Sequence, residues 1–339
     1  MEQGIIVVGK TKLNGFGVGS NTTDVINPLG EEYIVGGSSG GSAVAVSGNT
    51  VTCAVGTDTG GSVRCPAAFA ATVGYRPSYG AISRYGMSEM CGAFDTIGYI
   101  TNNVEQAMIM AYATIGWDKK DMNMRPEADE LKKKMAEVVN RASTATRMIN
   151  GWKPLEKVRI AMFDAQEICN LGYIDEENKK NMENVEKITK KLGAEVVKVE
   201  ALKLRECTAL YYVKTAKNVA TNIRRFKNYP YQNKKDCELE EFLLNLDPRI
   251  RERFLLDKKK ELIEWVEKNK IFKEVEFLIT PTTSELDIFE TVAPILGVCS
   301  ITLPMRNGKR PNAFQITGGY LQDHRLFEIS RIYEENMSI

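Results

Sequence analysis

GGSSGGS at residues 36–42 and GTDTGGSVR at residues 56–64 are the two stretches that decide how this sequence is interpreted. Glycine tolerates backbone conformations that other residues avoid, and it lets backbone N–H groups approach another group closely. Taken alone, the first stretch also suits a flexible linker of glycine and serine. A linker has no need of the apolar residues that flank both stretches, or of the helix expected through Ala43–Ser47 and the strand expected at Val51–Val55. We therefore interpret both stretches as tight turns of a folded core.

The residues of these turns suit hydrolytic chemistry at a carbonyl group. Converging backbone N–H groups stabilise a developing negative charge, and a serine beside such donors can attack a carbonyl once its proton is removed. On this reasoning Ser62 is a candidate nucleophile, and Asp58 is expected to brace its turn by accepting backbone hydrogen bonds. A serine in a turn also commonly caps a helix, and the turn residues by themselves leave that alternative open.

Together, the two stretches resemble the amidase signature, in which two serines and a lysine form a catalytic triad. Ser38 and Ser62 are 24 residues apart, which is the spacing of that family. The resemblance implies that Ser62 is the nucleophile and that Ser38, joined through a cis peptide, is the bridging serine. It also implies that the backbone of four residues forms the oxyanion hole: Thr59, Gly60, Gly61 and Ser62.

The likeness continues along most of the chain. The chain is similar to the A subunit of the tRNA-dependent amidotransferases more than to other amidases. The segments that carry it are GKT at 9–11, RPSYG at 76–80, SRYG at 83–86, FDTIG at 94–98 and TPTT at 280–283. The resemblance implies an α/β fold in which helices cover both faces of a mixed central β-sheet. We expect a single domain over residues 1–339. Residues 1–117, which hold 20 of the 27 glycines, would be its catalytic core, and the helix-rich residues 118–339 would contribute the substrate pocket.

The resemblance also implies substrate-binding residues for glutamine, because charge-assisted bonds can hold both ends of an amino acid. Asp287 has the sequence spacing from Gly297 of the family's aspartate, which binds the amino group of glutamine. Arg253 matches the family's arginine, which binds the carboxylate of glutamine. The Tyr211–Tyr212 pair is expected to line the pocket, with Tyr212 as the substrate-binding residue. Each of the three also fits a plain structural position: an exposed loop, a solvated helix face and core packing.

Two departures from the family pattern stand out. The family's catalytic lysine lies farther upstream of its first serine than this sequence extends from Ser38. We therefore expect an N-terminally truncated fold in which the lysine base is absent from the chain. Lys10 resembles a second lysine of the family and is expected to be structural. Cys65 stands where the A subunits of the amidotransferases usually have glutamine.

The function that the resemblance implies is a glutaminase. It would supply ammonia to a B subunit, which uses ATP and Mg to convert Glu-tRNA(Gln) to Gln-tRNA(Gln), while a C subunit clasps the pair. No phosphate-binding loop is visible, so we expect no cofactor on this chain itself. Two alternatives stay open: a stand-alone amidase for another small amide, and a non-catalytic scaffold subunit, which the missing lysine favours.

The composition argues against several other classes of protein. His324 is the only histidine, so we expect no metal site and an exposed histidine near the start of the last helix. Seven cysteines without a CxxC pair favour a reducing compartment over a disulfide or zinc scaffold. A net charge of +1 offers no basic field for RNA, so contact with tRNA is expected only through the B subunit. Without a signal peptide or a membrane-spanning apolar run, we expect the cytoplasm, or the mitochondrial matrix in a eukaryotic organelle system.

Hydrophobic periodicity predicts alternating strands and helices in the rest of the chain. Further strands are expected at Ile5–Val8, Val158–Phe163, Ala194–Val199, Val275–Thr280 and Cys299–Leu303. Further helices are expected at Val104–Ile115, Thr208–Phe226, Arg251–Lys268 and Gln322–Glu335. One more helix, capped by Asp175 and ended by Gly193, would complete a β-α-β unit with parallel pairing.

Overall fold

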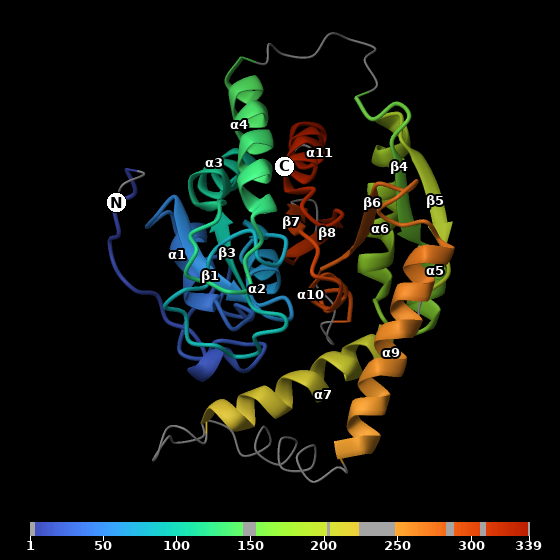
Figure 1. Ribbon diagram of the computed structural model, residues 1–339. Coiled ribbons are helices and arrows are strands. Elements are labelled where there is room, and N and C mark those ends of the chain that lie inside the picture. Colours follow the sequence, from blue (N-terminus) through green and yellow to red (C-terminus); the bar gives the residue numbers. More distant parts are fainter. Residues whose placement is uncertain are drawn as a thin grey trace.

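The centre of the molecule is one eight-stranded β-sheet with the strand order β1-β3-β2-β7-β8-β6-β4-β5 (Figure 1). The computed structural model describes residues 4–144, 154–201, 204–223, 248–282, 288–305 and 310–337. The strands are β1 (Cys53–Asp58), β2 (Val73–Arg76), β3 (Thr96–Thr101), β4 (Arg159–Phe163), β5 (Glu195–Val199), β6 (Phe277–Pro281), β7 (Ser300–Met305) and β8 (Asn312–Thr317). β4 pairs in parallel with β5 and β6, and the remaining pairs are antiparallel, which confirms the predicted mixed sheet.

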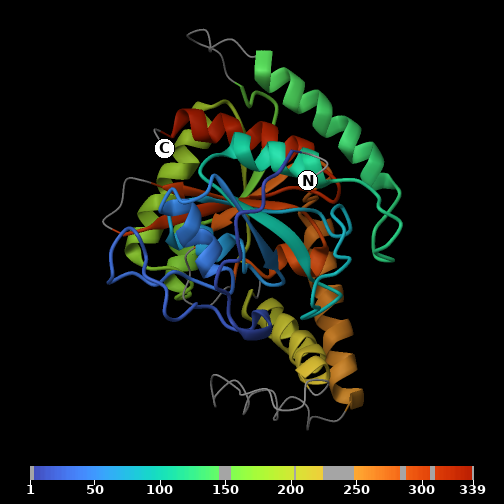
Figure 2. The same cartoon turned by 90° about the vertical axis from the view of Figure 1, so that its left-hand side faces the viewer.

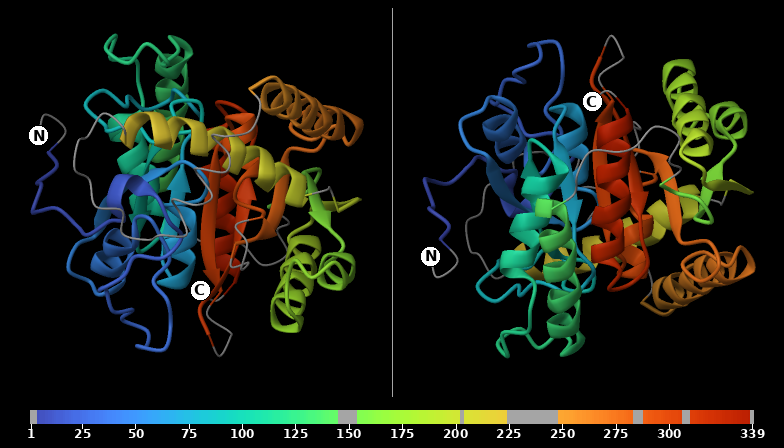
Figure 3. Two further views of the ribbon diagram at one scale, coloured as in Figure 1. Left: turned by 90° about the horizontal axis from the view of Figure 1, so that it is seen from below. Right: turned by 90° about the horizontal axis from the view of Figure 1, so that it is seen from above.

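Helices cover both faces of this sheet, as the resemblance implies (Figure 2). The helices are α1 (Gly40–Ser47), α2 (Arg64–Phe69), α3 (Val104–Thr114), α4 (Glu127–Thr144), α5 (Ala165–Asn170), α6 (Glu176–Lys191), α7 (Leu204–Ile223), α9 (Pro248–Lys268), α10 (Val292–Leu296) and α11 (Asp323–Asn336), with a short 3-10 helix η1 (Gly15–Gly17). One face carries α3, α4, α6 and α11. The other face carries α1, α2 and α10, and the long helix α7 crosses below it (Figure 3).

The strand sequences alternate between these two layers. In β4, Ile160 and Met162 belong to the apolar cluster under α3, α6 and α11, whereas Ala161 and Phe163 belong to the cluster that includes α7, α9 and α10. Successive side chains of a strand point to opposite faces, so a strand covered on both sides reads as a continuous apolar run. This explains why the sequence shows β4 as an uninterrupted apolar segment.

The predicted β-α-β unit is confirmed. β4 leads through α5 and α6 to β5, and β4 and β5 pair in parallel from Arg159 with Glu195 to Phe163 with Val199. Asp175 is the N-cap of α6, where its side chain accepts a hydrogen bond from the backbone N–H of Asn178.

The prediction of a strand at Ile5–Val8 is wrong. This segment has no regular secondary structure and pairs with no strand of the described chain, and Ile6, Val7 and Val8 are 72–85% exposed. The free edge of β1 is not open to it at Val55, because the carbonyl there accepts a hydrogen bond from the Ser42 hydroxyl of α1. An apolar run predicts a strand only when a partner edge is available.

The expectation of an exposed His324 is also wrong. His324 is the second residue of α11 and is half-buried, with Nδ1 wholly shielded from solvent. Burial and the charges of Lys134, Arg325 and Arg141 lower the pKa of His324 to about 4. Among the helices that the structure describes, none has the length and apolar composition needed to cross a bilayer.

Candidate active site

The structure places the two glycine- and serine-rich turns against each other. The backbone N–H of Ser39 donates a hydrogen bond to the carbonyl of Ser62 at 3.2 Å. The hydroxyl of Ser39 reaches the carbonyl of Thr57 at 3.5 Å, so the start of α1 runs beside the end of β1. The peptide bond between Gly37 and Ser38 is cis, in agreement with the resemblance. Segments that lie 24 residues apart in sequence therefore meet at the two predicted serines.

Ser38 lies inside this junction and is 2% exposed. Its carbonyl accepts hydrogen bonds from the Asn14 N–H and the Thr22 hydroxyl, both at 3.2 Å. A Cβ atom placed on Gly17 would lie 3.6 Å from Ser38 Oγ, so η1 covers the serine closely. Within the described residues, neither the Ser38 nor the Ser62 hydroxyl forms a hydrogen bond. The hydrogen-bonding capacity of both hydroxyls is thus not used by the described part of the chain.

Neither lysine that precedes the turns is joined to these serines. Lys10 is exposed to solvent, and Lys12 forms an ion pair with Asp24 at 2.8 Å. Both side chains thus point toward solvent rather than toward the serine pair.

Asp58 holds the second turn in shape. Its carboxylate accepts hydrogen bonds from the N–H groups of Gly61 at 3.0 Å and Val63 at 3.3 Å, which confirms its predicted bracing role. Arg64 and Arg76 each form an ion pair with it at 3.0 Å, and all three side chains are fully buried. Burial opposes ionisation of Asp58, but the two guanidinium groups outweigh it and hold the pKa of the carboxyl well below its usual range. The turn is thus built around a permanently charged carboxylate.

Arg64 ties this turn to the far part of the sheet. It donates to the side-chain oxygen of Gln315 in β8 at 2.6 Å and to the carbonyl of Glu290 at 2.8 Å. The Glu290 side chain packs on Gly61, where an added Cβ would lie 2.7 Å from Glu290 Cβ and 3.0 Å from the Cys65 sulfur. Cys65, the departure from the family pattern, therefore fills space beneath Gly61.

Only part of the predicted oxyanion hole is available in this geometry. The Gly61 N–H is directed at Asp58 and is not available to a substrate. The N–H groups of Thr59, Gly60 and Ser62 form no hydrogen bonds within the described part of the chain. These three donors can face a developing oxyanion.

Tyr211 and Asp95 flank the same turn. An added Cβ on Gly60 would lie 2.3 Å from Cζ of Tyr211, so the buried phenol ring of α7 rests directly on this glycine. On another side, the Thr59 hydroxyl donates to Asp95 Oδ1 at 2.6 Å. Asp95, in the FDTIG segment, was not predicted from the sequence to have a role, whereas Tyr211 belongs to the tyrosine pair that was expected to line the pocket.

Within the described residues, the structure does not bring the predicted substrate-binding residues to the serine turn as it brings the two serines together. Tyr212 is 41% exposed, whereas Tyr211 contacts the turn, because neighbouring residues of a helix point in different directions. The Arg253 side chain is 86% exposed and lies 3.7 Å from Asp257 on the outer face of α9, so the structure does not bring it to the turn. Arg251, two residues earlier, is the buried arginine of this helix. Asp287 lies outside the described residues.

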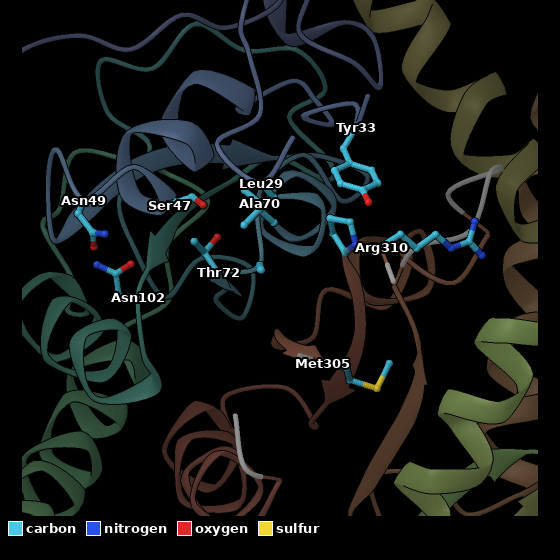
Figure 4. Close-up of a pocket in the computed structure, with 11 residues that line it drawn as sticks. Leu29, Tyr33, Ser47, Asn49, Ala70, Thr72, Asn102, Met305 and Arg310 are labelled. Carbon is cyan, nitrogen blue, oxygen red and sulfur yellow. The ribbon is translucent and has the colours of Figure 1, made fainter. Parts of the chain in front are cut away.

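A surface hollow of about 450 Å³ lies elsewhere, beside the ends of α1 and α2 and of β7 (Figure 4). Its lining includes Ser47, Thr72, Asn102 and Arg310. It contains none of the predicted catalytic residues, and Arg310 is engaged in an ion pair with Glu177. The chemistry predicted from the sequence therefore belongs to the serine junction and not to this hollow.

Comparison with known proteins identifies the family of this chain. A family model described as amidase matches residues 1–290. The A subunit of the glutamyl-tRNA(Gln) amidotransferase of Thermotoga maritima is 29% identical over 99% of this chain and 76% of its own length. The corresponding protein of Clostridium botulinum (strain Loch Maree) is 30% identical over 99% of this chain and 75% of its own length. The crystal structure of the Thermotoga maritima protein superposes with a TM-score of 0.76 at 28% identity, covering 98% of this chain and 74% of that one. This chain belongs to the amidase signature family.

Proposed function

We propose that this chain hydrolyses a carboxamide with Ser62 as the nucleophile, and that it serves as the glutaminase subunit of a tRNA-dependent amidotransferase. The observation that carries the proposal is the junction of the two turns, in which the Ser39 N–H binds the Ser62 carbonyl beside three N–H groups that no acceptor of the described residues occupies. Similarity to the A subunits of amidotransferases over nearly the whole chain supports the choice of glutamine.

In the proposed reaction Ser62 Oγ attacks the amide carbon, and its proton passes through Ser38 to a base. The oxygen of the tetrahedral intermediate accepts hydrogen bonds from the turn amides of Thr59, Gly60 and Ser62. The C–N bond then breaks, ammonia leaves with the transferred proton, and an ester to Ser62 remains. Water hydrolyses this ester to release glutamate and restore the serine.

The base is the part of this scheme that other residues must supply, because no lysine of the described chain is joined to either serine. The resemblance implies a lysine in that position. The ammonia would travel to a B subunit, which would use ATP and Mg to amidate Glu-tRNA(Gln), with a C subunit clasping the pair.

A stand-alone amidase remains a second candidate, and the position of Arg253 favours it. An arginine that is 86% exposed on the outer face of α9 does not bind a glutamine carboxylate at the serine junction. A smaller or uncharged amide would not need that contact.

The test is ammonia release from glutamine and from other small amides, by the chain alone and together with B and C subunits. We expect release from glutamine that increases with the partners, is abolished in Ser62→Ala and is strongly reduced in Ser38→Ala. Ser20→Ala, an exposed serine on the preceding loop, is the matched control and should behave as wild type. Release only from other amides would favour the stand-alone enzyme. If no ammonia is released under any condition, the result favours the non-catalytic scaffold subunit.

A further inference from the structure

The carboxylate of Asp95 gathers three hydrogen-bond donors from two separate segments. The Thr59 hydroxyl donates to Oδ1 at 2.6 Å, and the backbone N–H groups of Met90 and Cys91 donate to Oδ2, each at 2.9 Å. The residue is 1% exposed. A buried carboxylate needs such donors, because burial by itself penalises its charge.

The two segments that Asp95 joins each belong to the surroundings of one serine of the junction. Thr59 is in the turn that carries Ser62. Met90 lies near Ser38: an added Cβ on Gly17 would lie 3.7 Å from the Met90 sulfur and 3.6 Å from Ser38 Oγ. One carboxylate is therefore linked both to the turn of the nucleophile and to the segment beside the second serine.

Helix α7 contacts both ends of this connection. Tyr211 rests on Gly60, next to Thr59. Farther along the same helix, the Asn218 amide lies 3.4 Å from the Cys91 sulfur, and the Asn222 amide donates to the Glu89 carbonyl at 2.9 Å. The turn and the segment at residues 89–91 are thus held as one unit, with Asp95 at its centre.

Burial raises the pKa of the Asp95 carboxyl, and the donors from Thr59, Cys91 and Met90 oppose that rise. An asparagine could keep its side-chain oxygen toward the N–H groups of Met90 and Cys91 while its NH₂ group donates to the Thr59 hydroxyl, so it need not break the connection. A leucine has a similar size and forms no hydrogen bond on either side, and it therefore removes the connection.

We propose that Asp95 is a positioning residue for the amide-hydrolysing site, which fixes Thr59 of the oxyanion turn and the Met90–Cys91 segment relative to each other. This inference rests on the proposed function for its effect on rate. Its geometric part, the coupling of the two segments, stands without it.

Ammonia release by Asp95→Leu and by Thr59→Val tests the effect on rate. We expect kcat to fall by about 10–100-fold with KM little changed, because displacement of an oxyanion donor acts on the transition state. Thr59→Ser, which keeps the hydroxyl, should retain more activity than Thr59→Val. The double variant Asp95→Leu/Thr59→Val should be little worse than Asp95→Leu, because both changes break the same hydrogen bond.

Asp323→Leu is the matched control. Asp323 is also fully buried and accepts three hydrogen bonds, from the Tyr75 hydroxyl, the Ser78 N–H and the Ser78 hydroxyl, but it lies at the start of α11. It should change stability without changing kcat.

Hydrogen exchange of the backbone amides tests the coupling in the absence of activity. Asp95→Leu should lower protection both at residues 57–63 and at residues 89–92, whereas Asp323→Leu should leave both unchanged. Unchanged protection at residues 57–63 in Asp95→Leu overturns the inference. So does a wild-type kcat for Asp95→Leu in an assay in which Ser62→Ala is inactive. Activity that survives Ser62→Ala instead overturns the proposed function. In that case the hydrogen-exchange data alone test whether Asp95 couples the two segments.

Discussion

At the scale of single residues, buried charge shapes the candidate site. Arg64 and Arg76 are both fully buried and share the single carboxylate of Asp58. Removing one partner of such a group typically costs about 3–5 kcal/mol, because the remaining charge is left uncompensated. The buried charges therefore contribute strongly to holding the serine turn in its observed conformation.

Gly60 is the position where the close packing of the turn can be tested directly. In Gly60→Ala the new methyl group would lie 2.3 Å from Cζ and 2.5 Å from the hydroxyl of Tyr211, so the ring or the turn must move. We expect a loss of about 1–3 kcal/mol in the free energy of unfolding, measured by urea denaturation.

Two variants complete this test. Gly9→Ala meets nothing within 4 Å and should leave the stability unchanged. Tyr211→Ala should remove most of the additional cost of Gly60→Ala, because the overlap no longer exists. Strictly additive effects of the two substitutions would contradict the contact.

At the scale of elements, local signals define the helices well. α6 begins after Asp175, whose side chain accepts from the Asn178 N–H at 2.9 Å, and it ends just before Gly193 with φ +99°. Gly193 takes up the left-handed conformation that glycine adopts at little cost. Both ends of this helix were predicted from these two residues, because a cap and a C-terminal glycine act over a few residues only.

Asp175 allows the cap to be separated from an ion pair. Asp175→Ala should cost about 1 kcal/mol of unfolding free energy, because the first turn of α6 loses its acceptor. Asp175→Asn keeps an acceptor and loses only the exposed ion pair with Arg310, a type of interaction typically worth about 0–1 kcal/mol. Urea denaturation of the two variants should therefore show a larger loss for alanine, and equal losses would show that the ion pair dominates.

At the scale of the whole molecule, the two halves of the sequence share one sheet. β1, β2 and β3 come from the glycine-rich half, and β7 joins them to the other strands by pairing with β2. Beneath the serine turn the sheet is polar: Gln315 of β8 accepts from Arg64 and Ser300, and donates to Thr280 at 2.9 Å. The charged turn is thus anchored on strands from the far end of the sequence.

The single histidine gives the molecule a measurable dependence on pH. The pKa of His324 is lowered from 6.5 to about 4 in the folded state, so the unfolded chain takes up a proton first as the pH falls. The stabilising contribution of the neutral imidazole is complete above pH 6.5 and is lost as the pH falls toward about 4. His324→Gln should flatten the free energy of unfolding across this window, and identical pH profiles for the two proteins would disprove the assignment.

Much of the fold could be predicted from sequence, but not all of it. The longer helices α3, α6, α7, α9 and α11 and the parallel β-α-β unit followed from periodicity, caps and turn residues, whereas the short helices α2, α5 and α10 did not. β2 and β3 were not predicted either, because Gly74 and Gly98 interrupt their apolar runs and glycine is uncommon in strands. Ile5–Val8 was predicted as a strand from its apolar residues alone, yet it has no pairing partner in the described chain.

The sequence by itself determined the serine pair, the turns that carry it and the family, because these depend on residue types at fixed short spacings. Only the tertiary structure decided which tyrosine contacts the turn, that Arg253 faces solvent, and that the Gly61 N–H is taken up by Asp58. Those outcomes depend on how helices and strands from distant parts of the chain pack together. The spacing of residues along the chain does not specify that packing.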